Sequence, residues 1–364
     1  IKGITQTSFL PLAEPLIQNG NCEVAQRQVS ATGITASGYH TIDRMHVAIG
    51  SMGTWTFIQE ALTSGAAFEA GFANAYRMDC TTADASPGAG DYLQFKYVLE
   101  GQDCQVFKKG TSAAETYTLA FWVKSNKTGT AQVNLIDDNT RMCSATYTIA
   151  VADTWEHKIL NFAADTSNAV DDDNSAGYQL SWWLDAGSNF TSGTVPTAWE
   201  ARVTADRGVE NLSLADSTSN DWAITGIQLE VGTYTSSDLP PFRHESFGTN
   251  LARCQRYYEN NYRPGHYPGD SVVDGGSYSG FLYSTDFLTG FSPFKVTKRD
   301  NPTMTFYDRN GTEAKWYAGV YQVSEAIDDI VASIYTTAGW AGTISPVAAN
   351  TNEGHGYWEA FSDL

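Results

Sequence analysis

Five side chains of this 364-residue sequence could together hold a neutral sugar, and they lie on three short stretches of alternating apolar and polar residues: Trp122, Trp183, Gln132, Asn134 and Gln179. The C–H groups of a sugar ring stack on aromatic rings, and its hydroxyls need paired donors and acceptors such as amides. Side chains of a strand alternate between the two sheet faces, and each of these five is out of phase with its apolar neighbours. We therefore expect all five on one sheet face, as a glycan-binding face. The alternative is that a loop layer or a second subunit covers this face, because surface aromatic residues often mark interfaces.

The apolar residues of the same stretches predict a sandwich core. Similar alternation recurs at 93–99, 147–151 and 227–231, and the breaks between stretches are rich in Asp, Asn, Gly and Ser. Roughly eight to ten short strands between about 16 and 235 favour an all-β fold of two packed antiparallel sheets. The side chains expected to point into its core are Leu119, Phe121, Val123, Val133, Leu135, Leu180, Trp182 and Leu184.

Catalytic chemistry has little support in the sequence. No two carboxylates have a spacing that fixes a general acid against a base, and the six histidines show no metal-ligand spacing. Motifs for a nucleophilic serine, a phosphate loop or a dinucleotide are also absent from the sequence. We therefore predict that the chain is not an enzyme.

The acidic run 171–174 is the one stretch that could hold a metal ion. Asp171 and Asp173 offer carboxylate oxygens, which Ca²⁺ prefers. The run does not match the spacing of an EF-hand loop, and acidic tracts on an acidic protein are usually only solvated. Apart from this candidate structural calcium, the sequence predicts no cofactor.

The formal net charge of −19 restricts the partners of the chain. Binding to nucleic acid requires Lys and Arg that release counterions from phosphates, and anionic lipid also attracts basic segments. We expect neither nucleic acid nor a membrane as a partner, and no apolar run approaches the length of a membrane span. The five cysteines lack Cys-x-x-Cys spacing, which predicts free, buried thiols.

Composition and periodicity divide the chain into four parts. Residues 1–14 form an arm or linker, 15–240 the sandwich, 241–260 a connector with a short helix, and 261–364 a smaller β domain. The arm is apolar enough to need cover but too short for a core of its own, so we expect it to pack against another chain. Strands of the smaller domain are expected at 304–307, 330–335 and 356–364.

Pro240 and Pro241, where the sandwich meets the connector, hold the backbone extended. The helix that follows should be capped by Ser246 or Thr249. Its apolar face is expected to carry Leu251, Cys254 and Tyr258.

The stretch from Trp222 to Tyr258 also carries a resemblance. It contains W-A-I-T-G-I-Q-L-E-V-G, L-P-P-F and N-L-A-R-C-Q-R-Y-Y, and it is accompanied by L-I-Q-N-G-N at 16–21, V-A-Q-R at 24–27 and Tyr39 with I-D-R at 42–44. These segments resemble virion proteins of tailed bacteriophages in which a carbohydrate-binding-module-like jelly roll ends in this way. The resemblance covers most of 15–260, and it implies jelly-roll topology for the sandwich.

The resemblance further implies a non-enzymatic structural protein, a tail-fibre or spike component that contacts host surface polysaccharide or a neighbouring virion protein. A homotrimer in the virion, assembled in the cytoplasm of the bacterial host, is the implied state. Modules of this type often carry a structural calcium, which would favour Asp171 and Asp173 as ligands. Two alternatives stay open: a capsid-mounted fibre or decoration protein anchored by the arm, and a glycan-binding module of a polysaccharide-degrading enzyme.

Overall fold

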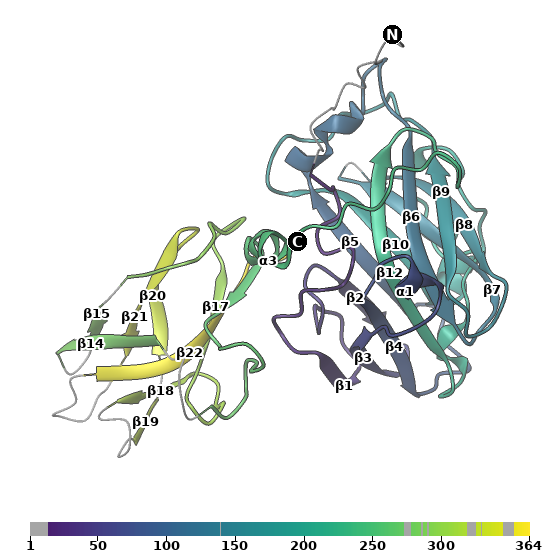
Figure 1. Cartoon of the computed structure of the whole chain (residues 1–364). Coiled ribbons are helices and arrows are strands. Elements are labelled where there is room, and N and C mark those ends of the chain that lie inside the picture. Colours follow the sequence, from purple (N-terminus) through teal and green to yellow (C-terminus); the bar gives the residue numbers. More distant parts are fainter. Residues whose placement is uncertain are drawn as a thin grey trace, which may run out of the picture.

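The chain folds into two β units with a short helix between them (Figure 1). The computed structural model describes residues 14–138, 140–272, 278–284, 287–289, 291–318, 325–328, 330–344 and 353–364. The predicted N-terminal arm therefore lies outside the described residues up to position 13. No helix in the described part of the chain is long and apolar enough to span a membrane.

The larger unit is a sandwich of two antiparallel six-stranded sheets. The first sheet has the order β1 (Ser30–Ile34), β3 (Thr54–Ala61), β4 (Asn74–Thr82), β12 (Asp221–Val231), β6 (Tyr117–Ser125) and β9 (Glu156–Phe162). The second sheet has the order β11 (Glu200–Ala201), β8 (Arg141–Ile149), β7 (Gly129–Asp137), β10 (Ala176–Ala186), β5 (Tyr92–Glu100) and β2 (His46–Gly50). The chain crosses repeatedly from one sheet to the other, as in a jelly roll, so the predicted fold class is confirmed.

Short helices lie at the ends and edges of the sandwich. They are α1 (Ala66–Glu69), η1 (Gly101–Phe107), α2 (Ser188–Thr191), η2 (Thr204–Asp206) and η3 (Leu214–Asp216). The last three belong to one long segment between β10 and β12, residues 187–220, which we call the covering loop.

The core of the sandwich contains every side chain that strand phase assigned to it. All eight predicted inward residues of β6, β7 and β10 belong to one buried apolar cluster between the two sheets. Within it the ring of Phe95 contacts Trp182 of its own sheet and Trp222 of the facing sheet, with centroids 5.3 and 5.4 Å apart. Such aromatic contacts add to the burial of apolar area and join the two layers. The five cysteines are free and buried, as predicted.

A bulge in β12 shifts the alternation of inward and outward side chains by one residue. Trp222 and Ile224 point inward, and so do Ile227 and Leu229, which requires one extra residue between the pairs. Gly226 supplies it with φ +62°, a conformation that side chains with a Cβ rarely adopt. A Cβ at this position would also lie 2.6 Å from Phe72 Cζ, so the bulge and the packing both require glycine.

The predicted connector helix is α3 (Phe247–Gln255), and Ser246 is its cap, since the Ser246 hydroxyl accepts a hydrogen bond from the Thr249 amide at 3.3 Å. The helix is shorter than expected. Tyr258 does not lie on its apolar face but begins β13 (Tyr258–Asn260), where it pairs with Phe361. The helical spacing of Tyr258 was therefore misleading, because main-chain pairing with the C-terminal strand determines its position.

The smaller unit is built around β22 (Glu353–Phe361), which pairs with β13, β14 (Tyr278–Ser284), β17 (Thr303–Tyr307) and β18 (Lys315–Ala318). The strands expected near 304–307, 330–335 and 356–364 are confirmed. The other strands described in this unit are β15 (Phe287–Thr289), β16 (Ser292–Pro293), β19 (Glu325–Asp328), β20 (Ile330–Thr336) and β21 (Gly339–Ile344).

Polar contacts fasten the two units to each other. Glu100, at the end of β5, accepts hydrogen bonds from Arg256 Nε and Nη2 at 2.7 Å and from the Tyr257 hydroxyl at 2.5 Å. The C-terminal residues return to the sandwich, where the Tyr39 hydroxyl donates to the Leu364 carbonyl at 2.6 Å. The C-terminus accordingly lies beside α3, between the two units (Figure 1).

Candidate functional site

The structure divides the five predicted sugar-binding residues between opposite sides of the sandwich. Trp122 lies on β6 in the first sheet, whereas Gln132 and Asn134 on β7, and Gln179 and Trp183 on β10, lie in the second sheet. All five are out of phase with the core, as expected, but the outer faces of two packed sheets point in opposite directions. The prediction of one shared face was therefore wrong, because strand phase does not reveal to which sheet a strand belongs.

Trp122 is a packing residue of the first sheet. Its ring stacks on His157 with centroids 4.8 Å apart and an interplanar angle of 23°. It also packs against a small apolar cluster that includes Phe72 and Trp155. Burial lowers the pKa of His157 below its ordinary value. The ring is thus half-buried among its own neighbours and does not form an open plate for a sugar.

On the second sheet, the covering loop buries three of the four remaining residues. Trp183, Gln132 and Asn134 have no exposed surface. Gln132 Nε2 donates to the Asp206 carbonyl at 2.8 Å, and Asn134 Nδ2 donates to the Arg207 carbonyl at 2.7 Å. The predicted glycan role of these three residues is corrected here, because a loop layer occupies their side of the sheet.

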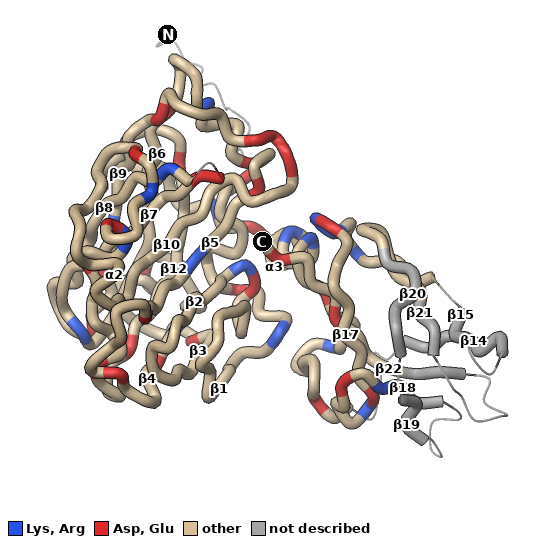
Figure 2. Tube along the Cα trace, turned by 180° about the vertical axis from the view of Figure 1, so that it is seen from behind, with Lys and Arg blue, Asp and Glu red and all other residues tan. Residues whose placement is uncertain are grey.

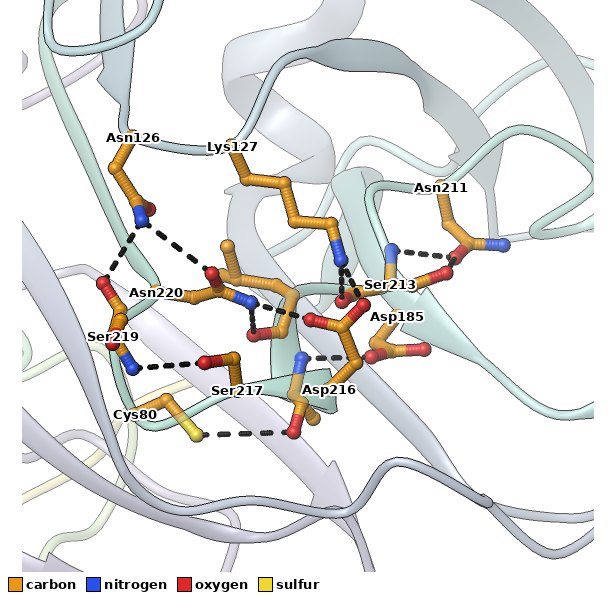
Figure 3. A network of polar contacts seen from close by, with 12 residues as sticks. Cys80, Asn126, Lys127, Asp185, Asn211, Ser213, Asp216, Ser217, Ser219 and Asn220 are labelled. Atoms are coloured by element: carbon orange, nitrogen blue, oxygen red, sulfur yellow. Dashed lines mark hydrogen bonds and ion pairs between the residues drawn. The ribbon is translucent and has the colours of Figure 1, made fainter.

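A polar network fixes the end of the covering loop to the sandwich (Figure 3). Asp185 of β10 accepts a hydrogen bond from the Ala215 amide at 2.8 Å. Lys127, in the turn before β7, donates to the Ser213 carbonyl at 2.7 Å and pairs with Asp216. Asn220 Nδ2 donates to Asp216 Oδ1 at 2.7 Å. The loop is therefore held in place from both sheets.

Beside the covering loop, the strands β2, β5 and β10 place a row of polar side chains on the same outer face. In register, His46 of β2 pairs with Lys96 of β5, and Lys96 pairs with Ser181 of β10. Gln94 lies two residues from Lys96, on the same side of the strand. Gln179 Nε2 donates to the Ser181 hydroxyl at 2.7 Å. His46, Lys96 and Gln179 are half-buried, so this part of the face is accessible. We call these five residues the polar row.

Several buried polar atoms at this face have no hydrogen-bond partner among the described residues. They are His46 Nδ1, Gln94 Oε1, Gln132 Oε1, Trp183 Nε1 and Arg207 Nε. Buried polar groups in native proteins are nearly always hydrogen-bonded. Similar atoms occur in the sandwich core, such as Trp182 Nε1 and Trp222 Nε1, but His46 Nδ1 and Gln94 Oε1 belong to strands at the accessible part of the face, where solvent or a ligand rich in donors and acceptors can satisfy them.

The electrostatics of the face are set by cations that lie close to one another. Burial, followed by the charges of Arg207 and Arg202, lowers the pKa of Lys96 to about 8. Burial and the charge of Arg202 also lower the pKa of Arg207. Burial lowers the pKa of His46 to about 4, with a further contribution from Lys96. Lys96, Arg202 and Arg207 thus place positive charge at this face, although acidic segments are spread over the loops of the chain as a whole (Figure 2).

The predicted calcium ligands serve the local structure of an exposed loop. The Asp173 carboxylate accepts a hydrogen bond from the Ser175 amide at 2.8 Å, and the Asp173 carbonyl accepts one from the Gln102 amide at 2.8 Å. The Asp171 carbonyl accepts from Gln105 Nε2 at 3.3 Å. Within the described ranges, no three His, Cys, Asp or Glu side chains are grouped so that they could hold a metal ion. Calcium binding at Asp171 and Asp173 stays a prediction.

A concave region lies between the two units, with a volume of about 450 Å³. Its charged groups are mostly paired inside the protein: Arg27 pairs with Asp43 and Asp363, and Glu359 accepts the Tyr258 and Tyr307 hydroxyls at 2.7 and 2.5 Å. These contacts indicate a structural junction. Its lining consists of Arg27, Gln28, Tyr39, His40, Tyr258, Pro268, Tyr307, Glu359, Phe361 and Asp363.

Sequence reasoning missed the polar row except for Gln179. A signal for two more of its members was present, since Gln94 and Lys96 stand at the outward positions of the stretch 93–99. Arg207 carries no comparable signal, because a loop has no periodicity that predicts where its side chains lie.

Comparison with known proteins adds distant structural likenesses. No protein-family model matches the chain. No curated protein matches it in sequence. Among solved structures it is similar to the enzymatically active domain of tailspike protein 4 of bacteriophage CBA120, with 12% identity over 60% of this chain and 21% of that chain and a TM-score of 0.28. Thus, the matched part spans about a fifth of that tailspike chain.

Carbohydrate-binding modules are also among the structural neighbours. One is a family 11 module from Clostridium thermocellum in complex with a β-1,3-1,4-mixed-linked tetrasaccharide, with 9% identity, 57% and 98% of the two chains covered and a TM-score of 0.28. Another is TmCBM61 in complex with β-1,4-galactotriose, with 9% identity, 60% and 99% covered and a TM-score of 0.27. At such identities no ligand carries over from these proteins to this chain.

Proposed function

We propose that this chain is a non-enzymatic, saccharide-binding structural protein and that the outer face of its second sheet, at β2, β5 and β10, holds the saccharide. The observation that carries this proposal is the group of buried polar atoms without a partner at one face, beside a loop that is fixed in place. A saccharide presents hydroxyls that both donate and accept, so one ligand could satisfy the Gln94 carbonyl and the His46 ring together. Gln179, which is half-buried and is held by the Ser181 hydroxyl, orients further hydroxyls at the accessible edge.

The setting we propose is a phage particle. The resemblance of residues 222–258 to virion proteins of tailed phages supports a tail-fibre or spike component in the virion, with host surface polysaccharide or a neighbouring virion protein as its partner. A capsid-mounted fibre or decoration protein fits the same resemblance. A glycan-binding module of a polysaccharide-degrading enzyme is the alternative outside this setting.

Gln94→Leu tests the saccharide face directly. Gln94 is 2% exposed and its carbonyl oxygen has no partner among the described residues, so leucine removes a buried acceptor at similar volume. We expect binding to the best ligand of a glycan array to weaken about fivefold, as for the loss of one hydrogen bond, with an unchanged or higher melting temperature.

The matched control is Gln28→Leu, because Gln28 lines the concave region between the two units. It should bind like the wild type. If Gln28→Leu loses binding and Gln94→Leu keeps it, the site lies at the junction and the proposed face is wrong.

We further propose that the chain is a homotrimer and that residues 1–14 pack against a neighbouring copy. Ile1, Ile4, Phe9 and Leu10 give this arm apolar surface that needs cover. Light scattering of the full chain is expected to give three times the mass of one chain, 39.6 kDa. Deletion of residues 1–14 should then convert the trimer into smaller species. A full chain that is already a monomer, and stays one after the deletion, contradicts the trimer.

A further inference from the structure

Three cationic side chains, one in the polar row and two in the covering loop, have no acidic partner. Within the described part of the chain, Lys96, Arg202 and Arg207 form no ion pair. Arg44, Lys295 and Arg299 also form no ion pair there, but their side chains donate to main-chain carbonyls. The pairs that do form include the fully buried Lys298 and Glu259 at 2.6 Å. Lys96, Arg202 and Arg207 thus differ from these residues in having no carbonyl or carboxylate partner for the side chain in the described part of the chain, and they lie at the face where the saccharide is proposed to bind.

Their positions are fixed by the fold. Lys96 lies between His46 and Ser181 in the sheet register. The guanidinium of Arg207 lies over the ring of Trp183, 5.2 Å from its centroid, and the Arg207 carbonyl is held by Asn134. The Arg202 amide donates to the Thr140 carbonyl at 2.8 Å. The strand that carries Lys96 and the loop that carries Arg207 are therefore already in place before a ligand binds, which reduces the entropy lost on binding.

Crowding these cations raises the electrostatic free energy of the unbound face. Burial is the main cause of the lowered pKa values of Lys96 and Arg207, and this repulsion adds to it. A bound anion removes the repulsion and forms charge-assisted hydrogen bonds with an ammonium and a planar guanidinium. At physiological ionic strength, the distant acidic residues of the chain are largely screened beyond about 8 Å.

We propose that the saccharide bound at this face carries an anionic group, a carboxylate or a sulfate, and that Lys96 and Arg207 bind that group while Gln94 and Gln179 bind neighbouring hydroxyls. This inference rests on the proposed saccharide-binding function and names its ligand class. It differs from the neutral sugar that the aromatic and amide residues alone predicted. Arg202, which is exposed, adds charge at the rim of the site.

The test measures binding of the full chain to matched saccharides by calorimetry. The pairs are polygalacturonate with its methyl-esterified form, and dextran sulfate with dextran, together with a panel of neutral and acidic oligosaccharides and inorganic polyphosphate. We expect an acidic member to bind at least tenfold more tightly than its neutral counterpart. The pair that shows this preference identifies the anion as carboxylate or sulfate.

Lys96→Met should reduce that preference about tenfold, the effect of one charge-assisted hydrogen bond, with no loss in melting temperature because a repelled cation is removed. Arg202→Gln should reduce it less, since that side chain is exposed. The control is Lys108→Met, which removes the same charge from a residue paired with Glu115 away from this face. Lys108→Met should bind like the wild type.

Equal binding of neutral and acidic members, or an unchanged preference in Lys96→Met, overturns the anionic ligand while the saccharide face stands. Equal binding of polyphosphate and the best acidic saccharide also overturns it, because that result indicates charge without sugar recognition. Failure to bind any saccharide, neutral or acidic, removes the proposed function itself.

A pH profile gives a second readout. Lys96 is faced by His46 from β2, by Arg202 and Arg207 from the covering loop, and by the uncharged Ser181 and Gln179 from β10. With its pKa near 8, Lys96 loses its charge at higher pH, so wild-type affinity for the acidic saccharide should fall as the pH rises from 7 to 9.5. Lys96→Met should show no such fall, and a fall of the same size in this variant contradicts the assignment.

Discussion

Replacement of Trp183 by alanine is expected to lower the free energy of unfolding by about 3–5 kcal/mol, the range for a large aromatic side chain removed from a packed site. Trp183 has no exposed surface. Its ring contacts Phe190 of α2 and Tyr92 of β5, with centroids 5.1 and 6.4 Å away, and supports the guanidinium of Arg207. Alanine leaves a cavity between the second sheet and the covering loop, which the network around Asp185 and Asp216 prevents from collapsing.

Urea denaturation followed by circular dichroism measures this loss. Trp122→Ala is the matched control, because Trp122 lies on the outer face of the other sheet and is only half-buried. Trp122→Ala should lower the free energy of unfolding by less, about 1–2 kcal/mol, in line with the area that Trp122 buries. If the two variants lose the same stability, or Trp183→Ala loses less than about 1 kcal/mol, the covering loop does not hold this ring.

Glu100→Ala is expected to cost about 3 kcal/mol, because it leaves buried donors at the junction of the two units without an acceptor. The Glu100 carboxylate is fully buried and receives three hydrogen bonds from Arg256 and Tyr257. Arg256 keeps 30% of its side chain exposed, so water replaces part of what it loses. The hydroxyl of Tyr257, which is buried, has no such replacement.

The pH dependence of this contribution has a definite sign. Burial by itself would raise the pKa of Glu100, but the hydrogen bonds from Arg256 and Tyr257 outweigh it and hold that pKa below its ordinary value. A carboxyl whose pKa is lowered by folding stabilises the fold above its unfolded pKa of about 4.3, and the contribution is lost as the pH falls below that value. The stability difference between wild type and Glu100→Ala should therefore be largest near pH 7 and shrink towards pH 3.

Chemical denaturation at pH 7, 5 and 3 tests this, with Glu100→Gln as the control. Glutamine keeps the shape of the side chain and one acceptor, so Glu100→Gln should lower the free energy of unfolding at pH 7 by less than Glu100→Ala does. A difference between wild type and Glu100→Ala that stays constant from pH 7 to pH 3 would show that the ionised carboxylate does not stabilise the junction.

The sandwich core is an example of what local pattern predicts well. Alternation alone predicts that Phe121 and Trp182 point inward, and both lie in the core. The helix cap at Ser246 was also foreseen, since a hydroxyl before a helix satisfies a main-chain amide within three residues. Both features depend on interactions within a strand or a turn, which the order of neighbouring residues determines.

Local patterns do not predict which residues come together at the site. Trp122 and Trp183 have the same phase relative to the core but lie on opposite sides of the molecule, because their strands pair into different sheets. The covering loop brings Arg207, more than 100 positions along the chain from Lys96, to the same face. Neither sheet membership nor the path of a long loop leaves a periodic signal in the sequence.

By itself, the sequence determined the all-β class, the inward and outward side of each main strand, the free cysteines and the short connector helix. These follow from alternation, composition and capping, which act over a few residues. Only the tertiary structure decided which outward residues share a face, which are covered, and where three cations meet without a carboxylate. Those outcomes depend on strand pairing and loop packing between residues distant in the chain, where many local patterns are compatible with more than one arrangement.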